Sequence, residues 1–236
     1  MYAAGQKLIT TLLSNKKVNY KEQYSHKDKM YYLHRRTEII PFVPAAIKTA
    51  LDVGCATGGF GALLKENFNC EVWGVEPDTE SANAASKNID FVINDLFTEN
   101  LPQLADKKFD AIFFNDVLEH LQDPDKALRA CKHLLNFTGV IIASIPNIRW
   151  YPVILSLLRY KDFKYESAGV MDRTHLRFFT KKSMIRMFEE NGYKVITAEG
   201  INPSDFKYYK LLNFLLLNTQ RDMNYPQFVI VAKQSE

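Results

Sequence analysis

The chain alternates short apolar runs with stretches in which apolar residues recur at helical spacing. The apolar runs cover residues 49–53, 71–75, 91–94, 109–115, 139–145, 193–199 and 227–233. Helical spacing covers residues 60–68, 78–88, 125–135, 150–160 and 181–192. Short apolar runs are typical of buried strands, and a repeat of three to four residues predicts helices. Strands that alternate with helices predict an α/β fold, with a doubly wound, parallel sheet covered by helices on both faces.

The same pattern divides the chain into parts. Residues 1–40 combine a short amphipathic stretch with a polar, tyrosine-rich segment, and we expect an N-terminal helical arm or lid there. Residues 41–236 then form one domain. The fifth and sixth strands are separated by residues 146–192, far more than the 12 or so residues that a crossover requires. We therefore expect an insertion at about 147–180, placed where it can border a substrate.

Composition and charge narrow the class of protein. The chain has 236 residues, of which 47% are hydrophobic and 24% charged, and these values exclude a collagen, a disulfide miniprotein and a wholly disordered chain. The net charge of +3 is too small to indicate a polyanionic partner, although the first 50 residues are basic. Cys55, Cys70 and Cys131 form no CxxC pair, which favours a reduced, cytoplasmic protein. No apolar run approaches the length of about 18 residues that spans a membrane.

A glycine-rich loop follows the first predicted strand. Gly54, Gly58, Gly59 and Gly61 separate that strand from the next helix. Glycines let the backbone approach a ligand closely, and the start of a helix offers unpaired N–H groups. Glu76 ends the second strand, where an acid can accept hydrogen bonds from a ribose diol. The combination predicts a site for a cofactor that contains a nucleoside.

Two residues indicate which cofactor. Dinucleotide-binding loops follow the pattern G-x-G-x-x-G, and Ala56 stands at the second glycine of that pattern. Asp52 precedes the loop by two residues, where its charge would repel a pyrophosphate but suit an ammonium group. S-adenosylmethionine carries an ammonium and a sulfonium and no phosphate. The loop therefore favours S-adenosylmethionine over NAD.

Five segments resemble the ordered motifs of class I S-adenosylmethionine-dependent methyltransferases. They are LDVGCATGGFGALL (51–64), VWGVEPD (72–78), VINDLF (92–97), FDAIFFNDVLEHLQDP (109–124) and GVIIASIPN (139–147). Two further segments resemble two narrower groups of enzymes: YYLHRRTEIIPFVP (31–44) and DRTHLRFFT (172–180). The groups are bacterial methyltransferases encoded among surface-polysaccharide enzymes, and ubiquinone-biosynthesis O-methyltransferases. The resemblance implies a Rossmann-like sheet of seven strands, six parallel and the last antiparallel.

The resemblance also implies cofactor contacts. Glu76 matches the ribose-binding acid, Asp95 the residue that meets the adenine amino group, and Arg36 an arginine that faces the cofactor's carboxylate. The full expected set is Arg36, Asp52, Gly54, Cys55, Ala56, Thr57, Gly58, Phe60, Glu76, Pro77, Asn94, Asp95, Leu96, Asn115 and Val117. At Ala56 a methyl group is compatible with a negative φ. We expect a slightly altered loop that still binds.

Methyl transfer to a hydroxyl needs a group that removes the proton. His120, after the fourth strand, and His175, after the insertion, are the alternatives for this base, with His120 favoured slightly. Asp172 is an orienting candidate, as are two acids of the D-x-x-E-H pattern, Asp116 and Glu119. Such a pattern is associated with a divalent ion in the ubiquinone-pathway enzymes. A helix start with acids near its dipole is the simpler explanation of the pattern, and we expect no metal.

The expected activity is O-methylation of a small acceptor such as a sugar or glycan intermediate. Two alternatives are a nicotinamide-dependent oxidoreductase and a non-catalytic S-adenosylmethionine-binding module. A third is an RNA methyltransferase that uses the basic arm, but no Asn-Pro-Pro-Tyr string and no Pro-Cys pair is present, so a nucleic-acid acceptor is disfavoured. Four arginines around the insertion could hold an anionic group of the acceptor: Arg149, Arg159, Arg173 and Arg177. The sequence leaves the acceptor atom and the oligomeric state open.

Overall fold

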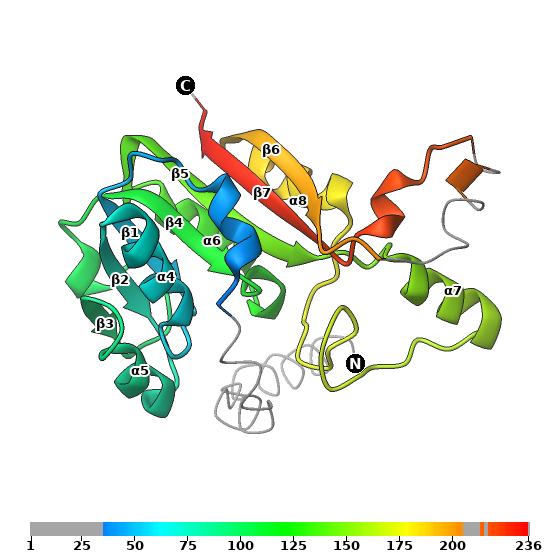
Figure 1. The fold of residues 1–236 in the computed structure, drawn as a ribbon, viewed down its shortest axis with the longest axis horizontal. Helices are drawn as coiled ribbons and strands as arrows, with labels where there is room; N and C mark the ends of the chain where they lie inside the picture. The colour runs from blue at the N-terminus through cyan, green and yellow to red at the C-terminus, as the bar shows by residue number, and fades with distance from the viewer. Residues whose placement is uncertain (1–34, 205–212, 215–216, 236) are drawn as a thin grey trace, which may run out of the picture.

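A seven-stranded sheet forms the centre of the molecule (Figure 1). This computed structural model describes residues 35–204, 213–214 and 217–235. The strands lie in the order β3-β2-β1-β4-β5-β7-β6. Their bounds are β1 Thr49–Val53, β2 Glu71–Val75, β3 Phe91–Ile93, β4 Phe109–Asn115, β5 Leu135–Pro146, β6 Tyr193–Ile201 and β7 Gln227–Gln234. Strands β1 to β5 pair in parallel, and β7 is antiparallel to both of its neighbours. The predicted α/β sheet, with an antiparallel last strand, is confirmed.

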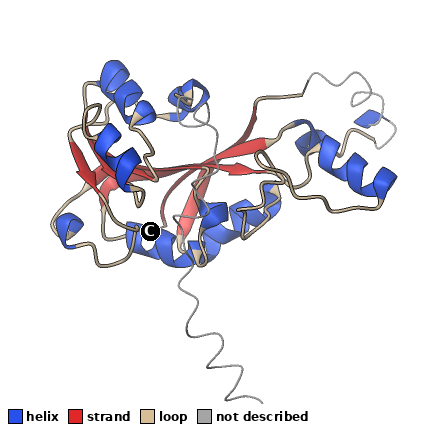
Figure 2. Cartoon of the chain, turned by 90° about the horizontal axis from the view of Figure 1, so that it is seen from below, coloured by secondary structure: helices blue, strands red, loops and turns tan. Residues whose placement is uncertain are grey.

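Helices cover both faces of the sheet, as Figure 2 shows from below. The α-helices are α4 Gly59–Phe68, α5 Thr79–Ala85, α6 Pro124–Cys131, α7 Tyr151–Tyr160 and α8 Lys181–Glu190. Short 3₁₀ helices are η1 Thr37–Phe42, η2 Pro102–Leu104, η3 Leu118–His120 and η4 Arg221–Asn224. Leu128 of α6 and Phe188 of α8 pack into the core on one face. Leu64 of α4 and Ile39 of η1 pack into the core on the other.

Local capping explains where the helices begin. The Asp78 side chain accepts a hydrogen bond from the Ser81 N–H at the start of α5. Thr180 and Ser183 form a reciprocal capping box at the start of α8. Such caps satisfy N–H groups that a helix leaves unpaired.

The helix expected over 125–135 is shorter than its apolar spacing suggested. It ends at Cys131, and Leu135 already begins β5. Leu135 is buried and pairs with Phe109 of β4, so strand pairing takes residues whose spacing also fits a helix. The early start makes β5 longer than the predicted run of residues 139–145.

The expected insertion contains α7, which lies away from the sheet in both views (Figures 1 and 2). Of its ten residues only Tyr151 is buried. The chain returns to the sheet at Phe179, which forms a bridge with Asn147. The arm over 1–40 lies mostly outside the described residues, and its boundary stays a prediction. Among the residues described, no helix is long and apolar enough to cross a bilayer.

Candidate active site

The glycine loop after β1 is a tight turn held against β2. The N–H groups of Gly54 and Cys55 both donate to the carbonyl oxygen of Val75, at the end of β2. Gly54 has φ +73°, and a Cβ there would lie 2.7 Å from Cγ2 of Val117. Gly58, also at positive φ, is the N-cap of α4. The loop therefore requires glycine at Gly54 on two grounds, conformation and space.

Ala56 differs from the expectation for this loop. Its φ is +49°, in the left-handed region, whereas a methyl group was expected to require a negative φ. The loop backbone keeps a conformation that favours glycine. The N–H of Ala56 donates to Oε2 of Glu76 at 2.9 Å. A non-glycine residue in this conformation costs about 1 kcal/mol. The hydrogen bond helps to hold the strained residue in place.

Replacing Ala56 with glycine is expected to stabilise the protein, because glycine adopts a positive φ without the Cβ clash. Relief of about 1 kcal/mol corresponds to a rise in Tm of about 2–4 °C for a chain of this size. Thermal unfolding measures the shift. The matched control is Ala62→Gly inside α4, which should lower Tm. A lower Tm in both variants would contradict the strain at Ala56.

Glu76 is fixed at the end of β2. Its carboxylate accepts hydrogen bonds from the N–H groups of Ala56 and Asp78, both at 2.9 Å. The side chain is buried, and burial raises its pKa. A carboxylate offers about four lone-pair positions, so acceptor capacity remains after these two bonds. Glu76 is placed to receive donors at the carboxyl ends of β1 and β2.

Asp52 adds a second buried carboxyl group beside the loop. Its pKa is raised to about 8, mainly by burial and also by the charge of Glu76, while the charge of Arg36 acts in the opposite direction. Two buried acids with raised pKa values favour a positively charged ligand, because a cation compensates their ionised forms. A pyrophosphate, which is negatively charged, cannot compensate either ionised acid. The two buried carboxyl groups therefore fit S-adenosylmethionine, which carries an ammonium and a sulfonium.

The other expected cofactor residues fall into three groups. Ala56, Thr57, Pro77, Asn115 and Val117 are half-buried around the ends of β1, β2 and β4, while Asn94, Asp95 and Leu96 are exposed beyond β3. Cys55 and Phe60 belong to the buried core. The Phe60 ring packs edge to face against Phe113, with ring centroids 5.0 Å apart.

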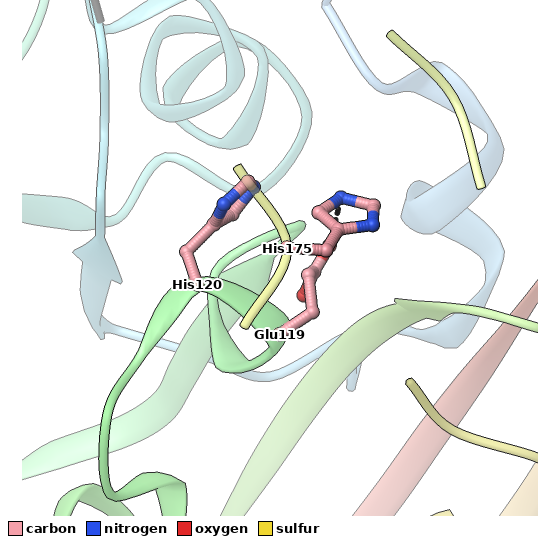
Figure 3. A group of neighbouring side chains, drawn as sticks. All are labelled: Glu119, His120 and His175. Atoms are coloured by element: carbon pink, nitrogen blue, oxygen red, sulfur yellow. Dashed lines mark ion pairs between the residues drawn. The ribbon is translucent and has the colours of Figure 1, made fainter. Parts of the chain in front are cut away.

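A second group of polar side chains lies beyond β4 (Figure 3). Glu119 and His120 belong to η3, and His175 comes from the loop after α7. All three are buried, and the His120 and His175 rings lie 4.8 Å apart. Glu119 Oε1 is 3.9 Å from His175 Nε2. The structure thus brings together the two candidate bases, which are 55 positions apart in the chain.

Hydrogen bonds to backbone carbonyls assign the histidine tautomers. His120 Nδ1 lies 3.1 Å from the carbonyl oxygen of Thr174, and His175 Nδ1 lies 3.1 Å from that of Val170. A carbonyl oxygen only accepts, so each Nδ1 carries its proton. Each neutral ring then has its basic lone pair on Nε2. Asp172 is buried, and it closes the turn by accepting from the N–H and hydroxyl of Thr174.

The same three side chains could hold a metal ion. One ligand atom from each of Glu119, His120 and His175 lies within 4.8 Å of the others. Metal-binding histidines usually donate their other N–H to a carbonyl or carboxylate, as both histidines do here. The D-x-x-E-H pattern is only partly brought together, because Asp116 pairs with Arg36 instead. His175 is the third member of the cluster in place of Asp116. Sequence spacing does not predict this, because His175 is far from Glu119 and His120 in the chain.

These features define a class I S-adenosylmethionine-dependent methyltransferase. Residues 24–198 match the model of a family described as methyltransferase domain, and the chain belongs to this family. S-adenosylmethionine is its cofactor, and the chain is an enzyme.

Relatives and solved structures agree with this class. The chain is 28% identical over 184 residues to a ubiquinone biosynthesis O-methyltransferase of Colwellia psychrerythraea, covering 74% of this chain and 70% of the relative. It is 25% identical to the Neisseria meningitidis enzyme of the same name, covering 75% of each. Its fold resembles a SAM-dependent methyltransferase from Archaeoglobus fulgidus, with TM-score 0.63, 18% identity, and 91% and 98% of the two chains covered.

Proposed function

We propose that the chain transfers the methyl group of S-adenosylmethionine to a hydroxyl oxygen of a small acceptor, a sugar or glycan intermediate. The observation that carries the proposal is the pair of histidines with basic Nε2 atoms beside buried Glu119. The similar proteins that are named O-methyltransferases support transfer to oxygen. The resemblance of residues 172–180 to polysaccharide-associated enzymes supports the sugar. A cytoplasmic location, inferred from cysteine usage, is part of the same proposal.

The cofactor roles follow from charge and position. Glu76 accepts hydrogen bonds from the ribose diol, and Asp52 compensates the ammonium group. Arg36 receives the carboxylate of the methionine moiety, and its charge already acts on Asp52. Asp95, exposed beyond β3, meets the adenine amino group. These assignments place the sulfonium between the loop after β1 and the residues that follow β4.

The reaction itself is an in-line displacement. The acceptor oxygen attacks the methyl carbon, the carbon–sulfur bond breaks, and S-adenosylhomocysteine leaves. The hydroxyl proton passes to Nε2 of His120 or His175. Glu119 lies 3.9 Å from His175 and stabilises an imidazolium there. Because the sulfonium is already activated, positioning provides much of the remaining rate.

A divalent cation on Glu119, His120 and His175 is a second candidate, favoured by their convergent ligand atoms. It would orient the acceptor and lower the pKa of its hydroxyl. Metal analysis of the purified protein and assays after chelation separate the two roles. Activity that survives chelation supports the base, and activity restored only by added Mg²⁺ or Zn²⁺ supports the cation.

An acceptor panel tests the proposed activity. Purified protein is incubated with methyl-labelled S-adenosylmethionine and with nucleotide sugars, free sugars, a catechol or RNA. We expect label on a sugar hydroxyl. Label on RNA alone would overturn the small acceptor, and label on the catechol alone would replace the sugar with an aromatic hydroxyl.

Binding of S-adenosylmethionine is expected to release a proton below pH 8. Asp52 has a pKa of about 8 in the free protein, so it is mostly protonated at neutral pH. The cofactor's ammonium would lower this pKa and favour ionisation. Affinity should therefore rise with pH, by at most about tenfold per pH unit, and level off above pH 8. Titration calorimetry in buffers of different ionisation enthalpy counts the protons; none released would contradict the assignment of Asp52.

A further inference from the structure

Asp116 is held at several points just beyond the end of β4. Its Oδ2 forms an ion pair with Nη1 of Arg36. Its Oδ1 accepts a hydrogen bond from Nε2 of Gln227 at 2.6 Å. Its backbone N–H donates to the carbonyl oxygen of Ser144 at 3.2 Å. The carboxylate is thus oriented by Gln227 of β7 and directed at Arg36.

Arg36 is fixed from the other side. Its Nη2 donates to Oγ of Ser144 at 2.6 Å, and Ser144 itself is fully buried in β5. Its Nε lies 2.9 Å from Oε1 of Glu38 in η1. The side chains of Arg36 and Asp116 are each only 13% exposed. Three segments, η1, the residue after β4, and β5, therefore meet at one guanidinium, and β7 reaches it through the hydrogen bond from Gln227 to Asp116.

The backbone at this contact is strained on both sides. Arg36 has φ +54° and Asp116 has φ +56°, a region that non-glycine residues rarely adopt. Strain of this kind persists where the surroundings fix the residue, and it concentrates at functional sites. The Arg36 charge also lowers the pKa of Asp52, so the guanidinium acts on the cofactor side of the loop. The strained pair thus lies beside the residues assigned to the cofactor.

We propose that Asp116 and Gln227 are positioning residues that hold Arg36 where it receives the carboxylate of the cofactor's methionine moiety. The proposal rests on the proposed role of Arg36. A guanidinium has five N–H donors, so it can bind the cofactor while it remains paired with Asp116. Asp116 then serves the cofactor rather than the cluster formed by Glu119, His120 and His175. It does so although Asp116, Glu119 and His120 belong to one short sequence pattern.

Ligand truncation separates positioning from a general structural role. Asp116→Asn keeps the shape of the side chain and removes its charge. The variant and the wild type are titrated with S-adenosylhomocysteine, which carries the amino-acid group, and with methylthioadenosine, which lacks it. We expect the variant to lose about tenfold in affinity for S-adenosylhomocysteine, the order of a charge-assisted hydrogen bond, and less than about twofold for methylthioadenosine. In assays, KM for S-adenosylmethionine should rise with little change in kcat.

Further variants complete the test. Gln227→Ala should show the same ligand pattern with a smaller loss, and Asp116→Glu should restore part of the affinity. Asp162→Asn, an exposed carboxylate after α7, is the matched control and should change neither titration. Equal losses for both ligands, or no loss for either, would overturn the positioning role while the proposed function stands. If the wild type binds neither ligand, the cofactor assignment and this inference both fail.

Discussion

Exchange of both His120 and His175 for asparagine is expected to lower kcat by about 10²–10⁴-fold, the range that a positioned general base contributes. Asparagine keeps a polar side chain but offers no basic nitrogen. Both rings donate Nδ1–H to a carbonyl, so the basic lone pair of each wild-type histidine is on Nε2. Affinity for S-adenosylmethionine should change little, because neither ring belongs to the expected cofactor set.

The single variants assign the base. The residue that takes the proton should give nearly the whole loss alone, and its neighbour a smaller one. Turnover with the acceptor that the panel selects is measured beside His133→Asn, an exposed histidine that serves as control. If the double variant keeps its rate within about threefold of wild type, the cluster is not the base.

Replacing Glu76 with alanine is expected to weaken S-adenosylmethionine binding by about 100-fold or more. The change removes hydrogen bonds to the ribose diol, each worth about 1.5–3 kcal/mol when the acceptor is charged. It also leaves the N–H groups of Ala56 and Asp78 without their present acceptor, which loosens the loop. Calorimetric titration measures the loss.

The ligand comparison distinguishes this variant from the Asp116 series. Methylthioadenosine retains the ribose, so its affinity should fall as steeply as that of S-adenosylmethionine. Glu80→Gln, an exposed acid in α5, is the control. Unchanged affinity in Glu76→Ala would remove the ribose assignment.

The local patterns predict most of the fold because they agree with the tertiary structure. The run at 49–53 is β1, and the run at 109–115 is β4, residue for residue. The error at 125–135 arises because Leu135 satisfies a helical repeat and a strand pair equally, and pairing with β4 decides. A local hydrophobic pattern carries no information about pairing between strands that are far apart in the sequence.

In the candidate site, too, some features are predictable from the sequence and others are not. The loop and Glu76 are predictable, because they lie at the ends of consecutive strands. The backbone at Ala56 is not predictable, because its positive φ accompanies a hydrogen bond to Glu76, which lies 20 positions further along the chain. The union of His120 with His175 depends on how the loop after α7 folds back onto η3, where the N–H groups of Leu176 and Arg177 donate to the Glu119 carbonyl. Asp116 lies within a plausible metal pattern, but its strained backbone turns it to Arg36.

Direct titration of the purified chain with S-adenosylmethionine, S-adenosylhomocysteine and NAD, side by side, tests the central claim that two buried acids at the ends of β1 and β2 select a sulfur nucleoside that carries an ammonium group. We predict a saturable heat of binding with both sulfur compounds and no heat of binding with NAD. Heat with NAD alone would contradict it.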